Sequence, residues 1–230
     1  MDLKIIHDIV RFYLNKEQGG WFAPEELDDL LDRAQWWFYS EQYDIYARTQ
    51  KITDALSVFS TPFSYTSTAN GVVSLPVDPK INPCYEHLLS IHCQYYDNIN
   101  QKTRYRAIKI INEDELAGRL DAQILAPTLQ HPVGVVTTVE GESAKLGTIQ
   151  LYPEAEITGK GFYLRRPLKP KFVYTMTGRE ITYNDNTSVQ MEWNETSMNK
   201  IIIKALQIAG VNITDQMIIE YTELKNAQNI

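Results

Sequence analysis

The stretch PEELDDLLDRAQWWFY, residues 24–39, decides how the first part of the chain folds. Pro24 suits the first position of a helix, and the acidic residues after it lie near the positive end of the helix dipole. Apolar residues then recur at helical spacing, which predicts an amphipathic helix that continues into the forties. These residues are Leu27, Leu30, Leu31, Ala34, Trp37, Phe38 and Ile45.

The acidic residues of this stretch allow two interpretations. They could form a pair of catalytic carboxylates or hold a divalent ion, but either role needs a pocket. Their position instead favours a solvated helix start that is stabilised by the dipole. The residues are Glu25, Glu26, Asp28, Asp29 and Asp32.

Aromatic residues are densest between residues 21 and 46, which hold three of the four tryptophans. Four adjacent residues point to all sides of a helix, so 36–39 cannot all face one core. Either other parts of the chain cover the remainder, or some of these residues contact another subunit, where Trp and Tyr are enriched. The candidate contact residues are Trp21, Phe22, Trp36, Trp37, Tyr39 and Tyr43.

Helical patterns also occupy both ends of the chain. Residues 2–14 predict a first helix that stops at Asn15, and a short third helix is expected near 53–59. Asn194 or Thr196 starts a helix whose segment 201–209 is apolar on nearly every side and therefore deeply buried. Gly210 ends this helix, and a last amphipathic helix begins at Thr214 or Asp215.

The middle of the chain has the alternation and turn residues of β-strands. Residues 63–67 lead into Asn70-Gly71, a strong signal for a hairpin, and 72–76 form the expected returning strand. Further strands are expected at 104–111, 133–139, 148–152, 161–165 and 171–175; 189–193 could add a last strand, and Asn112 caps a helix at 113–123. Residues 85–96 fit either a short helix or a buried strand, and the alternation of Leu89, Ile91, Cys93 and Tyr95 favours the strand.

This order of elements predicts an α+β protein. The N- and C-terminal helices form one helical bundle, and an antiparallel β module is inserted between them. Residues 1–61 supply the N-terminal helical part, 62–193 the β-rich module with one helix near 112–123, and 194–230 the helices that complete the bundle.

Charge and composition restrict the classes of function. A formal charge of −7 disfavours a protein that grips a nucleic-acid backbone, which needs a basic face. We expect no signal peptide and no membrane span, and the two cysteines require no disulfide framework. The 14 tyrosines against 7 phenylalanines favour wet surfaces that make contacts.

Potential metal ligands concentrate in one place, at Cys84, His87, His92 and Cys93. A zinc site needs tetrahedral geometry, and the adjacent residues His92 and Cys93 would point to opposite faces of a strand. Ordinary buried cysteines and histidines are the favoured interpretation, although a metal-dependent hydrolase using His87 and His92 stays an alternative. The string Gly159-Lys160-Gly161 lacks the spacing of a phosphate-binding loop. The sequence therefore predicts no catalytic site, no metal and no cofactor.

The run LRRPLKPK, residues 164–171, is basic in an acidic chain. It could be a solvated turn, or it could bind phosphate or an acidic partner surface. If it binds a partner, we expect a neighbouring protein and not DNA, because of the net charge. The candidate contact residues are Arg165, Arg166, Lys169 and Lys171.

Four segments resemble a known family in the same order over nearly the whole chain. They are LNKEQGGWFAPEEL (residues 14–27), IQLYP (149–153), YLRRPLKP (163–170), and EWNE (192–195) with AGVNITDQMIIEY (209–221). Together they resemble virion structural proteins of crAss-like bacteriophages, which have short tails. The resemblance implies a head–tail connector or adaptor: a ring protein of the neck or tail, below the portal, that joins capsid to tail.

The resemblance also implies partners and a location. The chain would assemble with itself in a cyclic, twelve-fold ring, and would contact the portal or other neck and tail ring proteins. DNA would pass through the ring during genome ejection without sequence-specific binding, and no membrane would be involved. The protein would be made in the cytoplasm of the bacterial host and reside in the virion. Alternatives are a tail-hub or peripheral tail component, and a glycan-binding module in which Trp36 and Trp37 stack on sugars.

Overall fold

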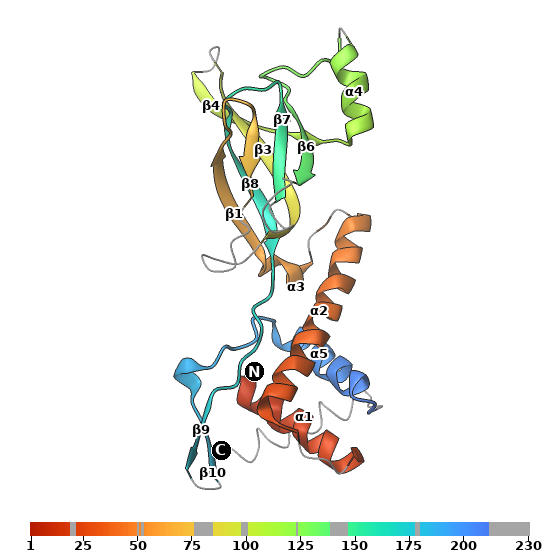
Figure 1. Ribbon diagram of the computed structural model, residues 1–230, viewed down its shortest axis with the longest axis vertical. Helices are drawn as coiled ribbons and strands as arrows, with labels where there is room; N and C mark the ends of the chain where they lie inside the picture. The colour runs from red at the N-terminus through yellow and green to blue at the C-terminus, as the bar shows by residue number, and fades with distance from the viewer. Residues whose placement is uncertain are drawn as a thin grey trace. The chain divides into compact units, whose positions relative to one another are not determined.

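The computed structural model describes residues 1–18, 22–49, 51, 53–75, 85–97, 101–122, 124–138, 147–177 and 180–211. The chain divides into two compact units (Figure 1). Unit 1 comprises Met1–Val58 and Pro167–Ile230, and unit 2 comprises Phe59–Arg166, which is inserted between them in the sequence. The protein is mixed α+β, with helices towards both ends and strands between them, as the sequence predicted.

The described part of unit 1 is built on three long helices. They are α1 (Leu3–Gln18), α2 (Pro24–Thr49) and α5 (Glu195–Ile208), and α5 packs against both others. The short helix α3 (Asp54–Ser57), the hairpin of β9 (Tyr174–Thr177) and β10 (Glu180–Tyr183), and the 3-10 turn η1 (Asp185–Thr187) complete the described part.

The core of unit 1 combines the apolar faces of these helices. The buried residues of α1 and α2 follow a helical period, but Trp37 and Ile45 of the apolar stripe predicted for α2 are exposed. Helix α5 buries one face, whereas the sequence predicted burial on nearly every side: Ile208 is 42% exposed. The core residues include Leu3, Ile6, Ile9, Val10 and Leu14 of α1, Leu27, Leu31, Ala34, Phe38 and Tyr39 of α2, and Met198, Ile201, Ile202, Ala205 and Leu206 of α5.

Local side-chain chemistry sets the limits of α5. The side chain of Asn194 accepts a hydrogen bond from the amide of Ser197 at 2.8 Å, so it caps the first turn. Gly210 ends the helix with a φ of 86°, and the amide of Val211 donates to the carbonyl of Leu206 at 2.8 Å. This left-handed glycine closure satisfies the last carbonyl groups of the helix. The predicted cap and end of this helix are confirmed.

Helix α1 is longer than predicted. It continues through Asn15 to Gln18 instead of stopping at 14. Asn15 is exposed, and an exposed Asn costs a helix interior only a few tenths of a kcal/mol, roughly, against the packing of the apolar face. The predicted helix from 214 onward lies outside the described residues.

The described residues of unit 2 form two four-stranded sheets. The first has the order β1 (Ser60–Thr66), β8 (Thr158–Arg165), β3 (Tyr85–Asp97) and β4 (Lys102–Ala107). The second has the order β2 (Val72–Ser74), β7 (Gly147–Tyr152), β6 (Val133–Thr138) and β5 (Lys109–Ile110). All pairs are antiparallel except β5 with β6, and helix α4 (Glu113–Asp121) follows β5.

The two sheets share one apolar core. Inward residues of both sheets form a single cluster of Tyr65, Val73, Leu75, Ile91, Cys93, Ile108, Ile149, Leu151 and Ile157. Glycines let the first sheet close tightly: a Cβ at Gly159 would overlap the carbonyl oxygen of His92 and the ring of Tyr65. The strand predicted at 85–96 is present as β3, and the helix predicted at 113–123 is present as α4.

The predicted hairpin at Asn70-Gly71 is wrong. The turn exists, with Gly71 at a φ of 79°, but β1 pairs with β8 and β2 pairs with β7. The chain crosses between sheets here because the carbonyl of Gly71 accepts a hydrogen bond from the amide of Leu151, at 2.8 Å, on β7. A local turn signal does not determine which strands the two sides pair with.

Three strand predictions also need correction. The strand expected at 104–111 is split at Ile108, which points into the core between β4 and β5. The strand expected at 171–175 begins later, as β9 from Tyr174, and its partner is the unpredicted β10. The segment 189–193 forms only an isolated bridge, between Val189 and Lys171.

The unit boundary lies at 58/59 and 166/167, whereas the sequence placed it near 62 and 193. The segment 167–193 belongs to the helical unit because it bonds to α2. The amide of Phe172 donates to the carboxylate of Asp28, and the carbonyl of Leu168 accepts from the side chain of Gln35. The segment contains prolines and β-type residues, so its sequence looks like a continuation of the β module. Nothing within the segment itself indicates that it bonds to α2.

Candidate interaction surfaces

The adjacent aromatic residues of α2 separate into an inward and an outward set. Phe38 and Tyr39 are buried and make edge-to-face contacts with the ring of Trp193, at centroid distances of 5.1 and 6.5 Å. Trp36 is half-buried and packs its edge against Tyr39 at 5.6 Å. Trp37 is 45% exposed. Trp37 is therefore the outward tryptophan of the pair.

Tyr39 is corrected as a candidate contact residue. It is 1% exposed, so its own unit covers it and no surface is left for a partner. Phe22 and Tyr43 are partly exposed, and Trp21 lies outside the described residues. The surviving aromatic candidates on α2 are Trp36, Trp37 and Tyr43.

A cation lies over the exposed tryptophan. The ammonium group of Lys204, on α5, is 3.9 Å from the centroid of the Trp37 ring. This cation–π contact fixes the indole against the adjacent helix and covers one of its two faces. The opposite side of the side chain remains available for a partner.

The second half of α2 buries none of its side chains. The buried residues of the helix end at Tyr39, and each residue from 40 to 49 is exposed or half-exposed. Four exposed residues at helical spacing form a single stripe, which we call the α2 stripe: Trp37, Glu41, Asp44 and Ile45. The stripe mixes two apolar side chains with two carboxylates.

The basic run 164–171 is largely engaged within the chain. The guanidinium of Arg165 lies 5.1 Å from the ring centroid of Phe59, and Arg166 forms a 2.6 Å ion pair with Glu86. Lys169 pairs with Asp29 at 2.5 Å, and the mutual attraction lowers the pKa of Asp29 and raises the pKa of Lys169. These contacts leave Lys171, whose side chain is exposed, as the candidate from this run that most readily meets a partner.

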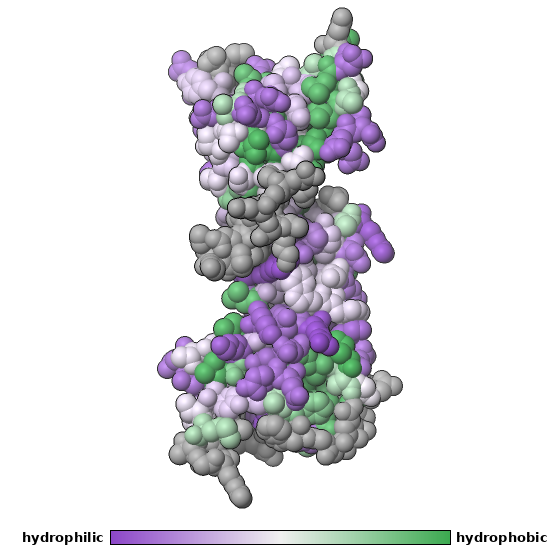
Figure 2. Space-filling model, in the orientation of Figure 1, coloured by the Kyte–Doolittle hydropathy of each residue, from purple (hydrophilic) through white to green (hydrophobic). Residues whose placement is uncertain are grey.

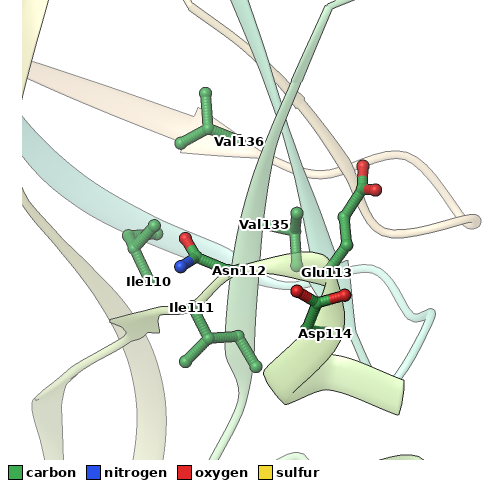
Figure 3. A pocket seen from close by; sticks show the side chains of 7 residues that line it. All are labelled: Ile110, Ile111, Asn112, Glu113, Asp114, Val135 and Val136. Atoms are coloured by element: carbon green, nitrogen blue, oxygen red, sulfur yellow. The ribbon is translucent and has the colours of Figure 1, made fainter.

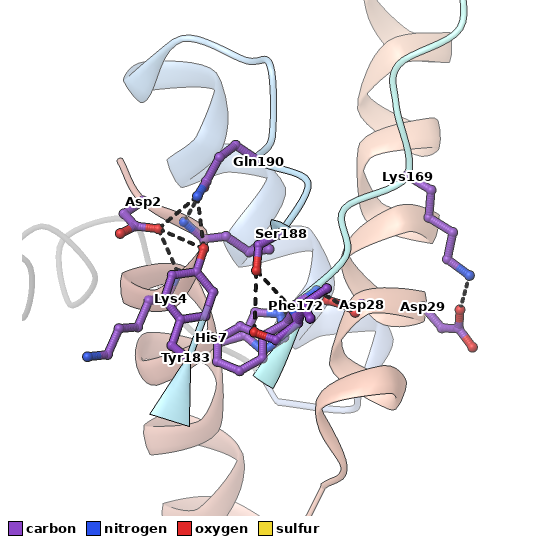
Figure 4. Close-up of polar contacts among 12 residues, drawn as sticks. Asp2, Lys4, His7, Asp28, Asp29, Lys169, Phe172, Tyr183, Ser188 and Gln190 are labelled. Carbon is purple, nitrogen blue, oxygen red and sulfur yellow. Dashed lines mark hydrogen bonds and ion pairs between the residues drawn. The ribbon is translucent and has the colours of Figure 1, made fainter. Parts of the chain in front are cut away.

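One residue of the acidic helix start is buried, against the prediction. Asp28 is 5% exposed, and its Oδ1 accepts a hydrogen bond from Nε2 of His7 at 2.9 Å (Figure 4). Its Oδ2 accepts from the amide of Phe172 at 2.9 Å, and the ring of Phe172 stacks on His7 with centroids 4.5 Å apart. Asp28 thus joins α1, α2 and the returning segment at one point.

A second polar residue of α2 makes the same kind of connection one heptad later. Gln35 is fully buried and accepts a hydrogen bond from the indole nitrogen of Trp193 at 3.2 Å. Its amide nitrogen donates to the carbonyl of Leu168 at 3.0 Å. We call His7, Asp28, Gln35 and Trp193 the polar hub of unit 1. The signal for it was present in the sequence, because residues 28 and 35 interrupt the apolar face formed by 24, 27, 31, 34 and 38.

A histidine hydrogen-bonded to a buried carboxylate also occurs in hydrolases, where the carboxylate orients the ring. Here both side chains are almost inaccessible, at 1% for His7 and 5% for Asp28, so a substrate cannot reach them. The structural role, a connection between distant segments, accounts for both of the carboxylate's hydrogen bonds.

The potential metal ligands of β3 do not converge. Cys93 is buried in the core, where burial raises the pKa of its thiol, and burial lowers the pKa of His87. His92 precedes Cys93 on the strand and points to the opposite face. Among the described residues, no group of three or more His, Cys, Asp or Glu side chains could hold a metal ion, and Cys84 lies outside them.

Unit 2 has a surface hollow of about 430 Å³ at the start of α4 (Figure 3). Apolar side chains of β5 and β6 line it together with the carboxylates of Glu113 and Asp114. Figure 2 shows a hydrophobic strip beside α4 in this region. The polar groups here are two adjacent acids at a helix N-terminus, a common stabilising arrangement. The lining residues are Ile110, Ile111, Asn112, Glu113, Asp114, Val135 and Val136.

Comparisons of the chain with models of known protein families and with curated proteins found no match. Within the described part of the chain, no helix is both long and apolar enough to span a membrane.

Proposed function

We propose that this protein is a structural component of the virion of a short-tailed phage, and not an enzyme. It assembles as a ring in the neck or tail below the portal, joins capsid to tail, and surrounds the channel through which DNA passes. The ordered segments that resemble crAss-like virion proteins support the assignment to the virion. The ring-forming part is supported by the surface of unit 1.

The observation that carries the proposal is the second half of α2. Ten residues of regular helix, 40–49, have no side chain buried within the chain, although they include Tyr43, Ile45 and Tyr46. A helical segment of this length is marginal without packing, since tertiary contacts supply most helix stability. In a ring, a different patch on the neighbouring subunit covers such a surface.

The exposed tryptophan favours a protein contact over a glycan site. Sugar stacking on Trp37 is limited to one face of the ring, because the ammonium of Lys204 lies over the other face. Trp36 is half-buried against Tyr39 and offers less surface still. A tail-hub or peripheral tail component would use the same contacts and differs only in its place along the tail axis.

Cryo-electron microscopy of purified virions tests the location. We expect density for this chain in a ring on the central axis between portal and tail. Density further down the tail would support the tail-hub alternative. Absence of the chain from virions, checked by mass spectrometry of the same preparation, would contradict the proposal.

Replacing Trp37 by Ala tests the contact role in the isolated protein. We expect Trp37→Ala to weaken self-association at least about tenfold, because large aromatic residues dominate interface energies. Met176→Ala is the control: Met176 is 64% exposed, on β9, and its loss should leave association unchanged. Binding on a glycan array that disappears in Trp37→Ala would instead support the sugar-binding alternative.

A further inference from the structure

The first sheet of unit 2 has one face in the core and one face open. Along β1, along β8 and from Ile91 to Tyr96 of β3, more exposed residues alternate with less exposed ones, as expected for an antiparallel sheet with one solvated face. The register places Lys160 of β8 beside His92 of β3, and Gln94 of β3 beside Tyr105 of β4. We call the outward residues of this sheet the open sheet face; its largest members are Lys160, Phe162, His92, Gln94, Tyr96 and Tyr105.

Three large aromatic side chains on this face are exposed to solvent. Phe162 is 41% exposed, Tyr105 48% and Tyr96 60%. The ammonium of Lys160 lies 5.5 Å from the ring centroid of Tyr105, so a cation and an aromatic ring form the centre of the face. Such a mixture of large rings and a positive charge is typical of a surface that meets a partner.

The charge of the open sheet face is opposite to that of the chain. Its cation is Lys160, in a chain with a formal charge of −7. The register pairs Arg104 with Tyr95 and Arg106 with Cys93, so these two side chains lie on the other face of the sheet. A second copy, with Glu41 and Asp44 exposed on α2, supplies carboxylates that complement Lys160.

The α2 stripe has the composition that the open sheet face would bind. Glu41 and Asp44 are exposed acids one helical turn apart, and Trp37 and Ile45 flank them. Arg48 lies one turn beyond, at the end of the stripe. A helix lying across an open sheet is one of the standard ways to bury both surfaces.

We propose that the α2 stripe of one copy packs on the open sheet face of the next copy. Glu41 and Asp44 then lie against Lys160, and the apolar residues of the stripe lie against Phe162 and Tyr105. The contact joins two different patches, so it is a head-to-tail contact that closes into a ring when the rotation permits. The inference rests on the proposed function for its ring, and names the two surfaces that form it.

A charge-swap experiment tests the pairing. Association is measured by sedimentation velocity for the wild type, Lys160→Glu, and the double variant Glu41→Lys/Asp44→Lys. Each variant places like charges at every contact, so we expect association to weaken at least about tenfold. An equimolar mixture of the two variants should restore it, because alternating copies again present opposite charges at both kinds of contact. A chain that carries all three changes should also associate.

Two controls separate this contact from general effects of charge and folding. Lys4→Glu makes the same change at an exposed lysine of α1, outside both surfaces, and should associate as the wild type does. Thermal melting followed by circular dichroism should show the same transition for every variant, because the substituted side chains are exposed.

Three outcomes would overturn the inference. They are a wild-type chain that stays monomeric up to about 1 mM, unchanged association of Lys160→Glu, and a mixture that does not recover. Binding of a poly-dT oligonucleotide that Lys160→Glu abolishes, with association unchanged, would assign the face to a polyanion instead. If the chain forms rings in virions but its association does not respond to the charge reversals, only this inference is refuted. If its association responds to the charge reversals but the chain is absent from virions, the proposed function is refuted.

Discussion

Unit 1 and unit 2 use different means to bring distant parts of the chain together. In unit 1, buried polar side chains connect segments that are far apart in sequence: Asp28 bonds to His7 and to the amide of Phe172, and Gln35 bonds to Trp193. In unit 2, the described core is an apolar cluster between two sheets, and close strand approaches at glycines such as Gly159 set the register.

The two units differ in how they select one packing arrangement over others. Apolar helix faces can pack in several arrangements, and a buried hydrogen-bonded pair penalises every arrangement that leaves a partner unsatisfied. A sheet needs no such pair, because a slip of one residue already moves every side chain to the opposite face. Unit 1 should therefore be most sensitive to loss of a polar group, and unit 2 to addition of a methyl group.

Replacing Asp28 by Ala should have the largest effect. Removing one partner of a buried charged or strongly hydrogen-bonded pair costs about 3 to 5 kcal/mol, because the other groups stay buried without a partner. All four tryptophans lie in unit 1, so tryptophan fluorescence during urea denaturation reports on this unit. We expect this transition to shift to much lower urea concentration.

The neighbouring carboxylate provides the control. Asp29 is exposed and pairs with Lys169 at the surface, so Asp29→Ala should leave the fluorescence transition nearly unchanged. Equal shifts for the two substitutions would show that Asp28 contributes through its charge at the helix start and not through the polar hub.

In unit 2, Gly159→Ala should have the next largest effect. The added Cβ overlaps the backbone carbonyl of His92, which cannot move away as a flexible side chain would. Overpacking of this kind costs about 1 to 3 kcal/mol. Far-ultraviolet circular dichroism should show earlier loss of the β signal, while the tryptophan transition of unit 1 keeps its midpoint.

Gly118→Ala is the matched glycine control. Gly118 lies in α4 with nothing within 4 Å of an added Cβ, so the substitution should stabilise the helix by about 0.5 to 1 kcal/mol. If Gly159→Ala were equally harmless, close strand approach would not be what fixes the register of the first sheet.

The smallest effect concerns one surface ion pair in each unit. The pKa of Asp29 is lowered by Lys169, and the pKa of Glu115 is lowered by Lys109 and Arg119. A lowered folded-state pKa contributes stability above the unfolded pKa, and this is lost as the pH falls through the folded value. In Lys169→Ala, nuclear magnetic resonance titration should show the pKa of Asp29 returning upward towards 3.8 while that of Glu115 stays low. If the pKa values of Asp29 and Glu115 both rose, the two carboxylates would be responding to the overall charge of the protein and not to their own ion pairs.

Periodicity predicted most of the elements and the mixed α+β class. The apolar face of α2 as far as Phe38, the helix α5 with its Asn194 cap and Gly210 end, and the strand β3 follow from local patterns that tertiary packing reinforces. Strand pairing was not predictable at Asn70-Gly71, because the turn specifies the local backbone and the hydrogen bond to Leu151 specifies the sheet.

The candidate contact surface was predicted only in part. Sequence reasoning established that 36–39 must sweep around the helix, but which tryptophan points outward depends on the position of Trp193. The acids at 25–32 were interpreted as one solvated group because their spacing fits a helix start. Asp28 departs from that group because it falls on the face that meets His7, a contact between residues 21 positions apart.

The two ends of the inserted module are held together at the place where they enter and leave. Ser60 of β1 is paired with Leu164 of β8, and the amide of Arg165 donates to the carbonyl of Phe59 at 2.9 Å. When the two ends of an inserted unit lie next to each other, the chain leaves and re-enters the surrounding unit at neighbouring positions. Genetic exchange of unit 2 for another module would thus alter only two adjacent peptide connections, so the β module can diverge or be replaced while the helical unit retains its fold.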